Sequence, residues 1–177
     1  MKETVKQYVG RIEGYAEGHE PLRVLKSTPA RLERLLADVP GRALARRPEP
    51  GKWSLAEILA HLAEGEIAFG YRVRMVASKN RTPIQAFDQD AWQENASALR
   101  ADPVGAFEMF RALRAQNVAF LTSLPRKAWS RYGRHEERGK ETLETMARRC
   151  AGHDLNHLRQ VRELAAVLAA GGGRRRR

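Results

Sequence analysis

Cysteine is almost absent from the 177-residue chain, because Cys150 is the only one. A single cysteine excludes an intrachain disulfide and any zinc site built from cysteines alone, and it is typical of a reducing compartment. Long apolar runs are also missing. No stretch approaches the roughly 18 residues of a membrane span, and residues 1–18 lack the apolar segment of a signal peptide. We therefore expect a cytoplasmic protein that does not contact a membrane.

Strand patterns and repeats are missing as well. No segment alternates apolar and polar residues long enough to predict a strand, and no period of about 20–50 residues recurs. Apolar residues instead recur at helical spacing in several long segments, which predicts an all-α four-helix bundle with long connections. The length predicts one domain, which we place at residues 1–170, followed by a flexible basic tail at 171–177.

Capping residues indicate where the helices begin. Ser27-Thr28-Pro29 predicts a start with a hydroxyl cap before a proline. Ser54 followed by Glu57 is a capping box, so a long helix is expected from Leu55 to about Ala77. Residues 78–101 are long for a loop, which is typical of a functional segment or of short helices. Asp102-Pro103 predicts another helix start, and the last helix is expected from about Glu141 or Thr142 to Ala170.

Charge gives a weak indication of the partner. The net charge is +11, and four positive charges belong to Arg174–Arg177, which leaves +7 for the rest (28 basic against 21 acidic residues). The other arginines are mostly interleaved with acidic residues and alanine rather than grouped with aromatic residues. This pattern favours a solvated helix face over a groove that follows a phosphate backbone, so nucleic acid is not the expected partner.

The histidines carry the strongest chemical signal. His153 and His157 are four residues apart on the core-facing side of the last expected helix, with Cβ atoms about 5–6 Å apart. His61, on a facing helix, completes a set of three nitrogens. Such a set favours zinc, nickel, iron or copper over magnesium or calcium, and it leaves a coordination position open. The alternative is that each ring forms a structural hydrogen bond.

Neighbouring residues have both a structural and a functional interpretation. Glu57, one turn before His61, is either part of the capping box or a catalytic base. Cys150 is expected in the core rather than as a fourth ligand or a redox-sensitive thiol. Gly65 either opens space above a metal or permits close helix packing. His135 is expected on the surface unless its irregular segment folds over the pocket.

Three segments together resemble the DinB-like family of four-helix-bundle proteins, also described as metal-dependent hydrolases. They are PEPGKWSLAEILAHLAEGE at 48–66, FRALRAQNVAFLTSL at 110–124 with the following Trp129 and His135, and GHDLNHLRQVREL at 152–164. The likeness covers about residues 20–170. It implies that His61, His153 and His157 are metal ligands, with zinc or nickel as the metal. It also implies an up-up-down-down bundle that forms a homodimer.

The resemblance leaves the activity open, because the family contains thiol S-transferases that use bacillithiol or glutathione, a mycothiol-dependent maleylpyruvate isomerase, and members without an assigned reaction. One hypothesis is a metal-dependent enzyme that acts on a small molecule, either as a transferase of a low-molecular-weight thiol or as a hydrolase. Glu57 is then the candidate base. Arg114 holds a carboxylate of the substrate or thiol cofactor, or forms a surface salt bridge. The competing hypothesis is a non-catalytic metal-binding stress or regulatory bundle.

Overall fold

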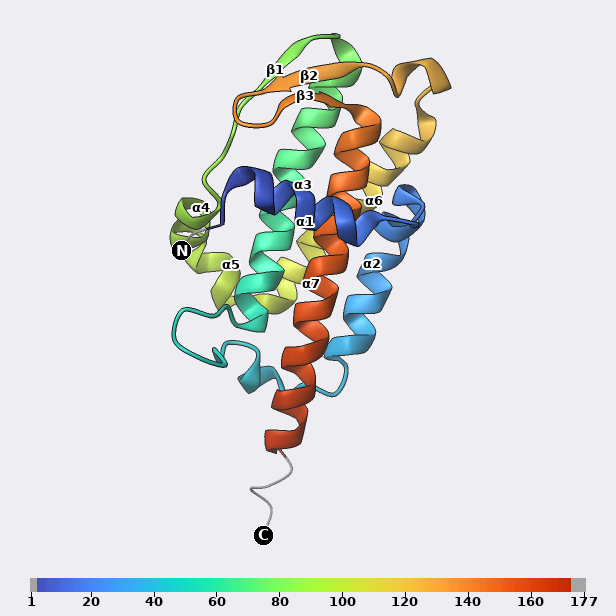
Figure 1. Cartoon of the computed structure of the whole chain (residues 1–177). Helices are drawn as coiled ribbons and strands as arrows, with labels where there is room; N and C mark the ends of the chain where they lie inside the picture. The colour runs from blue at the N-terminus through green and yellow to red at the C-terminus, as the bar shows by residue number, and fades with distance from the viewer. Residues whose placement is uncertain (1–2, 173–177) are drawn as a thin grey trace.

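The computed structural model of the protein describes residues 3–172, in which seven α-helices and three short strands occur (Figure 1). They are α1 (Val5–Ala16), α2 (Pro21–Leu36), α3 (Leu55–Ser78), β1 (Thr82–Ile84), α4 (Gln89–Asn95), α5 (Ser97–Ala101), α6 (Pro103–Ser123), β2 (Tyr132–His135), β3 (Gly139–Thr142) and α7 (Leu143–Gly172). Helix α7 ends two residues beyond the expected Ala170. The predicted tail of arginines, Arg174–Arg177, lies outside the described residues.

Helices α2, α3, α6 and α7 form a four-helix bundle, which confirms the expected fold class. Each helix contributes to both halves of the core. The half next to the sheet includes Val24, Val76, Leu121 and Met146. The opposite half includes Leu32, Leu55, Phe110 and Leu164. Helix α3 packs mainly on α6 and α7, and α2 packs mainly on α7 and α6.

The order of these core residues along each helix gives its direction. Helices α2 and α7 run from the sheet end of the bundle to the opposite end, whereas α3 and α6 run toward the sheet (Figure 1). The directions along the chain are therefore down-up-up-down, which corrects the expected up-up-down-down order. The cause is the long connection at residues 79–102. It returns through α4 and α5 to the end where α3 began, so α6 starts beside the start of α3.

Helix α2 begins at Pro21 with Glu20 as its N-cap, not at the expected Pro29. Pro29 lies inside the helix, where its missing N–H leaves the Leu25 carbonyl without its usual helical donor. Nη1 of Arg114 in α6 donates to that carbonyl at 3.2 Å. A contact from another helix thus replaces the lost bond, which explains why the local pattern was misleading.

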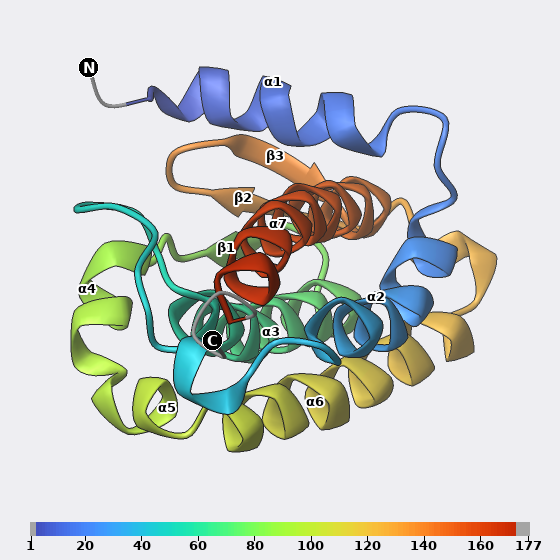
Figure 2. The same cartoon turned by 90° about the horizontal axis from the view of Figure 1, so that it is seen from below.

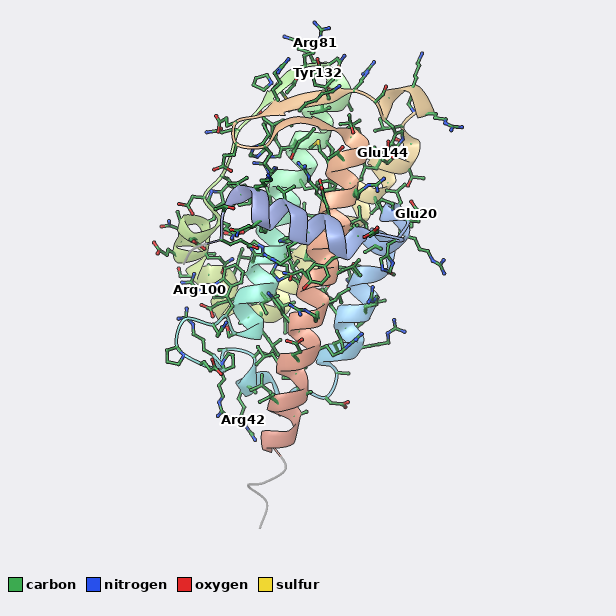
Figure 3. The ribbon with its side chains drawn as sticks, viewed as in Figure 1. Glu20, Arg42, Arg81, Arg100, Tyr132 and Glu144 are labelled. Atoms are coloured by element: carbon green, nitrogen blue, oxygen red, sulfur yellow. The ribbon has the colours of Figure 1, made fainter. Side chains whose placement is uncertain are left out.

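A small sheet at one end of the bundle corrects the expectation that the chain contains no strand. Strand β1 pairs in parallel with β2, and β2 pairs antiparallel with β3. The strands have only three or four residues, too few for an alternating pattern to stand out. Just before β1, Arg81 has a positive φ of 65° and donates its N–H to the Tyr132 carbonyl at 2.7 Å. Figure 3 labels both residues beside the sheet.

Helix α1 crosses α7 on the outside of the bundle (Figures 1 and 2). The crossing requires a residue without a side chain, because a Cβ at Gly152 would lie 2.0 Å from the carbonyl oxygen of Ile12. Nη1 of Arg11 donates to Oδ1 of Asn156 at 3.0 Å and fixes α1 on α7. This contact places α1 beside the part of α7 that carries the histidine pair.

Candidate metal centre

The three predicted ligands lie on two neighbouring helices that run in opposite directions. His61 is in the second turn of α3, whose start is the predicted capping box between Ser54 and Glu57. His153 and His157 lie one turn apart in α7. The fixed start of α3 and the packing of α3 on α7 bring the three rings together.

The ring nitrogens of this histidine triad converge. Nε2 of His153 lies 2.8 Å from Nε2 of His61 and 3.1 Å from Nε2 of His157. One possible ligand atom from each ring lies within 4.8 Å of the other two. Nε2 of His153 can carry only one proton although it faces two ring nitrogens. A single cation satisfies all three lone pairs at once, so the donor set fits a transition metal.

Gln160 sets the orientation of one ligand. Nδ1 of His157 lies 2.9 Å from Oε1 of Gln160, which can only accept, so Nδ1 donates and Nε2 keeps a lone pair facing the other rings. Metal-binding histidines usually have such a partner on the second ring nitrogen. Sequence reasoning missed Gln160, although its position three residues after His157 on the same helix indicates the contact.

Burial keeps the triad neutral. Burial and the charge of His157 hold the pKa of His61 well below its usual range, and burial together with both neighbouring rings does the same to the pKa of His153. Burial lowers the pKa of His157 to about 4. Neutral imidazole is the form that binds a metal. No second cluster of three metal-binding side chains occurs among the described residues.

Two cavities meet at the triad. The larger, of about 700 Å³, extends from His61 and His153 to the sheet. The second, of about 600 Å³, is lined by His61, His153, His157 and the loop before α3. Trp53 of that loop lies parallel to His157, with ring centroids 6.4 Å apart, and 4.9 Å from the centroid of His61. Sequence reasoning assigned no role to Trp53, although it directly precedes the cap of α3.

Gly65 and Cys150 both line the larger cavity. The functional interpretation fits Gly65, and the structural interpretation fits Cys150. A Cβ at Gly65 would meet no atom within 4 Å, so this glycine opens space near His61 and is not needed for close packing. The thiol of Cys150 lies 3.9 Å from both Arg114 and Glu66 and outside the triad. Burial raises its pKa well above the usual range, and its side chain packs against the core, as expected.

The candidate base Glu57 is held at the start of α3. One oxygen accepts the backbone N–H of Ser54 at 2.8 Å, and both oxygens contact Arg47. Although burial acts in the opposite direction, the bonds from Arg47 and Ser54 hold the pKa of this carboxyl below its usual value. The capping interpretation is thereby confirmed, and the catalytic role stays a prediction.

Arg114 is a buried residue, so the surface salt bridge considered for it is wrong. Its side chain is 2% exposed, and its guanidinium binds Glu66 of α3 at 2.8 Å and Asp154 of α7 at 2.9 Å. These charged residues, together with the Leu25 carbonyl of α2, connect all four bundle helices. We call Arg114, Glu66 and Asp154 the ionic cluster. Its role in holding a ligand carboxylate stays a prediction: both terminal nitrogens have protein partners, and the buried Nε has none among the described residues.

His135 does not lie on the surface. It is 3% exposed in β2 and lines the larger cavity, so its segment folds over the pocket. Burial and the charge of Arg138 lower its pKa to about 4. The surface interpretation failed because the segment GRHEERGK is irregular in pattern but forms a hairpin of two strands.

The fold and the triad define a helical bundle with a three-histidine centre between antiparallel helices. The sequence model of the DinB superfamily matches residues 25–161, and the chain belongs to this superfamily. No helix within residues 3–172 is long and apolar enough to cross a bilayer.

Two bacterial relatives are similar over most of their length. YfiT of Bacillus subtilis (strain 168), named "Putative metal-dependent hydrolase YfiT", is 25% identical over 146 residues, which cover 81% of this chain and 82% of YfiT. OB0413 of Oceanobacillus iheyensis, with the same description, is 20% identical over 148 residues, which cover 81% of this chain and 83% of OB0413. The solved structure of YfiT, described as having "an unusual four-helix bundle topology", matches with a TM-score of 0.76 at 21% identity. The match covers 94% of this chain and 90% of that one and supports the fold.

Proposed function

We propose that the protein is a metal-dependent enzyme that transfers a low-molecular-weight thiol to an electrophilic small molecule. His61, His153 and His157 hold a zinc or nickel ion in this proposal. The observation that carries it is the position of three converging, neutral imidazoles where two cavities meet. A purely structural metal site is closed by its protein ligands, whereas a catalytic site keeps an open position.

The presence of two cavities favours transfer between two substrates. Each substrate can reach the triad from its own side, because both cavities are lined by His61 and His153. Hydrolysis needs only water as the second reactant, so a single cavity is sufficient for it. The names of both relatives favour hydrolysis as the alternative. A non-catalytic metal-binding module predicts little open volume beside the triad, so the two cavities support the enzyme over this alternative.

When bound, the divalent metal supplies a Lewis acid that favours the deprotonated, nucleophilic form of a ligand in its open position. The residues of this chain supply the rest. Gln160 keeps the lone pair of His157 directed at the site, and Trp53 shields His61 and His157 on the side of the loop. Glu57 is the proposed base, a role that requires Arg47 to release its carboxylate.

Two other expectations remain predictions. The homodimer is supported by an apolar stripe on the outer face of α3, where Ile67, Tyr71 and Met75 are 43%, 65% and 39% exposed. The three residues are spaced by four, so they lie on one side of the helix. The cytoplasmic location is supported by the single cysteine.

The metal content tests the site. Wild-type protein and a His153→Ala/His157→Ala double variant are loaded with zinc or nickel and measured by elemental analysis. His19→Ala serves as the control, because His19 is exposed. We expect about one metal ion per chain in the wild type and the control, and none in the double variant. A wild type that takes up no metal after loading contradicts the proposal.

Thiol titrations then separate the two reactions. Bacillithiol, mycothiol and glutathione are added to the nickel-loaded protein while its absorption spectrum is recorded. Transfer predicts a new sulfur-to-nickel absorption band for one thiol and consumption of that thiol with an electrophile. An activity that proceeds equally without any thiol supports hydrolysis instead.

A further inference from the structure

We propose that the sheet end of the larger cavity binds an oxyanion group of the substrate, a carboxylate or a phosphate, through Arg72 of α3 and His135 of β2. The inference rests on the proposed function, because it places part of the substrate in the cavity that reaches the triad. It adds a second anchor point far from the metal.

The positions of the two residues define this subsite. Arg72 and His135 both line the larger cavity, as do His61 and Gly65. Residues 61, 65 and 72 share one face of α3, and a rise of 1.5 Å per residue puts the Cα of Arg72 about 16 Å from that of His61. Gly65 leaves the space between them open. A ligand that touches both ends is therefore extended.

Arg72 is a partly buried cation that has no carboxylate partner among the described residues. Its Nη2 donates to the Gln85 carbonyl, and its guanidinium lies 5.2 Å from the ring centroid of Phe87. Among residues 3–169, no carboxylate forms an ion pair with it at 4.0 Å or less. Burial and the charge of Arg138 lower the pKa of Arg72, although Glu141 and other nearby carboxylates act in the opposite direction. A partly buried cation whose charge no ion pair balances favours an added anion.

The neighbouring arginines of the same wall differ from Arg72. Arg138 lies 2.6 Å from Oε1 of Glu141, and Arg149 contacts the same carboxylate. Arg149 also lies 2.8 Å from Oε1 of Glu13. The charges of Arg138 and Arg149 are therefore compensated within the protein. Arg72 differs from them, because its charge is available to a ligand in the cavity.

His135 presents a hydrogen-bond donor that no described residue accepts. Its Nδ1 accepts the backbone N–H of Glu137 at 3.2 Å, so the neutral ring carries its proton on Nε2. This Nε2 is buried and has no partner among the described residues. Buried donors are almost always paired in folded proteins, so an acceptor from outside the chain completes the site.

An oxyanion meets both requirements. Its oxygens accept from Nε2 of His135 and from the free guanidinium nitrogens of Arg72, whose planar fork matches a carboxylate or a phosphate. A cavity of about 700 Å³ has the size of typical small-molecule sites. The structure thus assigns an extended, anionic substrate to the larger cavity, with the reacting atom at the triad.

Succinate and inorganic phosphate test the subsite on the full chain, in metal-free and zinc-loaded forms. Binding is followed by calorimetry and by the NMR signals of the His135 ring. We expect saturable binding of at least one probe in both forms, together with a rise in the pKa of His135, because a bound anion favours the protonated ring. The stronger probe shows whether the group is a carboxylate or a phosphate.

Matched variants locate the binding. Arg72→Met and His135→Phe are expected to weaken it at least tenfold, while His135→Gln, which keeps a donor near Nε2, preserves it. Arg134→Met is the control, because Arg134 lies on the same strand and is exposed. Equal weakening by Arg134→Met, or no binding to the wild type, overturns the proposal.

The His153→Ala/His157→Ala variant separates this proposal from the metal proposal. We expect the probe to bind this variant as it binds the wild type. Binding that requires zinc, or that disappears in the double variant, places the anion at the triad and overturns the subsite while it leaves the metal site intact. If the protein fails to load metal, the binding measurements on the metal-free protein still test the subsite.

Discussion

The ionic cluster and the histidine triad are two buried polar assemblies that lie beside each other in the bundle. Each charge of the ionic cluster has a partner, because Arg114 binds Glu66 and Asp154. Asn117 adds a hydrogen bond to Glu66 at 3.0 Å. The triad instead brings three lone pairs together, and within residues 3–169 no side chain supplies a cation to them. Burial is common to both assemblies, so internal compensation is the property that separates them.

This difference assigns different roles. The charges of the ionic cluster are compensated within the protein, and its contacts connect all four bundle helices, so its contribution is to the stability and arrangement of the fold. Nε of Arg114 is its one buried donor without a partner among the described residues. The triad becomes complete only when it binds something from outside. Removal of one member should therefore lower the free energy of unfolding in the first case and ligand affinity in the second.

Arg114→Met should have the largest effect on stability. The substitution leaves Glu66 and Asp154 buried without their cation, which costs about 3–5 kcal/mol of unfolding free energy. Urea unfolding of the metal-free protein measures the loss. Arg111→Met is the control, because Arg111 is an exposed residue of the same helix, and it should change the value by less than about 0.5 kcal/mol. Similar losses for both variants contradict the structural role.

Acid should destabilise the metal-free protein through its buried histidines. His135 and His157 have a pKa of about 4 in the folded state, against 6.5 when exposed. Between these values the unfolded chain binds protons that the folded chain does not, so the stabilisation is complete above about pH 6.5 and is lost as the pH falls toward 4. Each of these two histidines contributes at most about 1.4 kcal/mol per pH unit, so the two together contribute at most about 3 kcal/mol per pH unit.

Urea midpoints at about pH 7, 6 and 5 measure this loss of stability. The His135→Gln variant should lose less stability over the same pH range, because it lacks the contribution of His135. The carboxylates with a lowered pKa, Glu3, Glu57 and Glu141, lose their contribution only below their usual value of 4.5, so they do not account for the change. A stability that stays constant between pH 6.5 and 5 contradicts burial of neutral rings.

Local patterns predicted the features that depend on neighbouring residues. The capping box at Ser54 fixed the start of α3, and the spacing of His153 and His157 placed both rings on one face. His61 was also placed correctly, because a bundle brings inward residues of facing helices together. The candidate site could therefore be predicted from short-range rules and one rule of architecture.

Features that depend on distant contacts were missed. Pro29 was interpreted as a helix start because the Arg114 bond that compensates for it comes from another helix. The same distance along the chain hid the burial of Arg114, whose partners are 40 and 48 residues away. The order of helix directions depends on the path of residues 79–102, which no local pattern fixes.

Gln160→Leu should give the smallest effect, and it tests the triad side of the comparison. Loss of the acceptor for Nδ1 of His157 is expected to weaken zinc binding about 10- to 100-fold, or about 1.4–2.7 kcal/mol, because the ring is then free to turn and to change tautomer. Competition with a chromophoric chelator measures the affinity. Gln116→Leu, at an exposed position of α6, is the control and should leave zinc affinity unchanged.

The unfolding free energy of metal-free Gln160→Leu should stay within about 0.5 kcal/mol of the wild type, since Gln160 is only half-buried. Arg114→Met shows the opposite pattern if the comparison holds, because its main loss is in stability. A Gln160→Leu variant that binds zinc as tightly as the wild type shows that packing alone orients His157. A variant that loses stability without losing zinc affinity places Gln160 with the ionic cluster, as part of the fold rather than of the site.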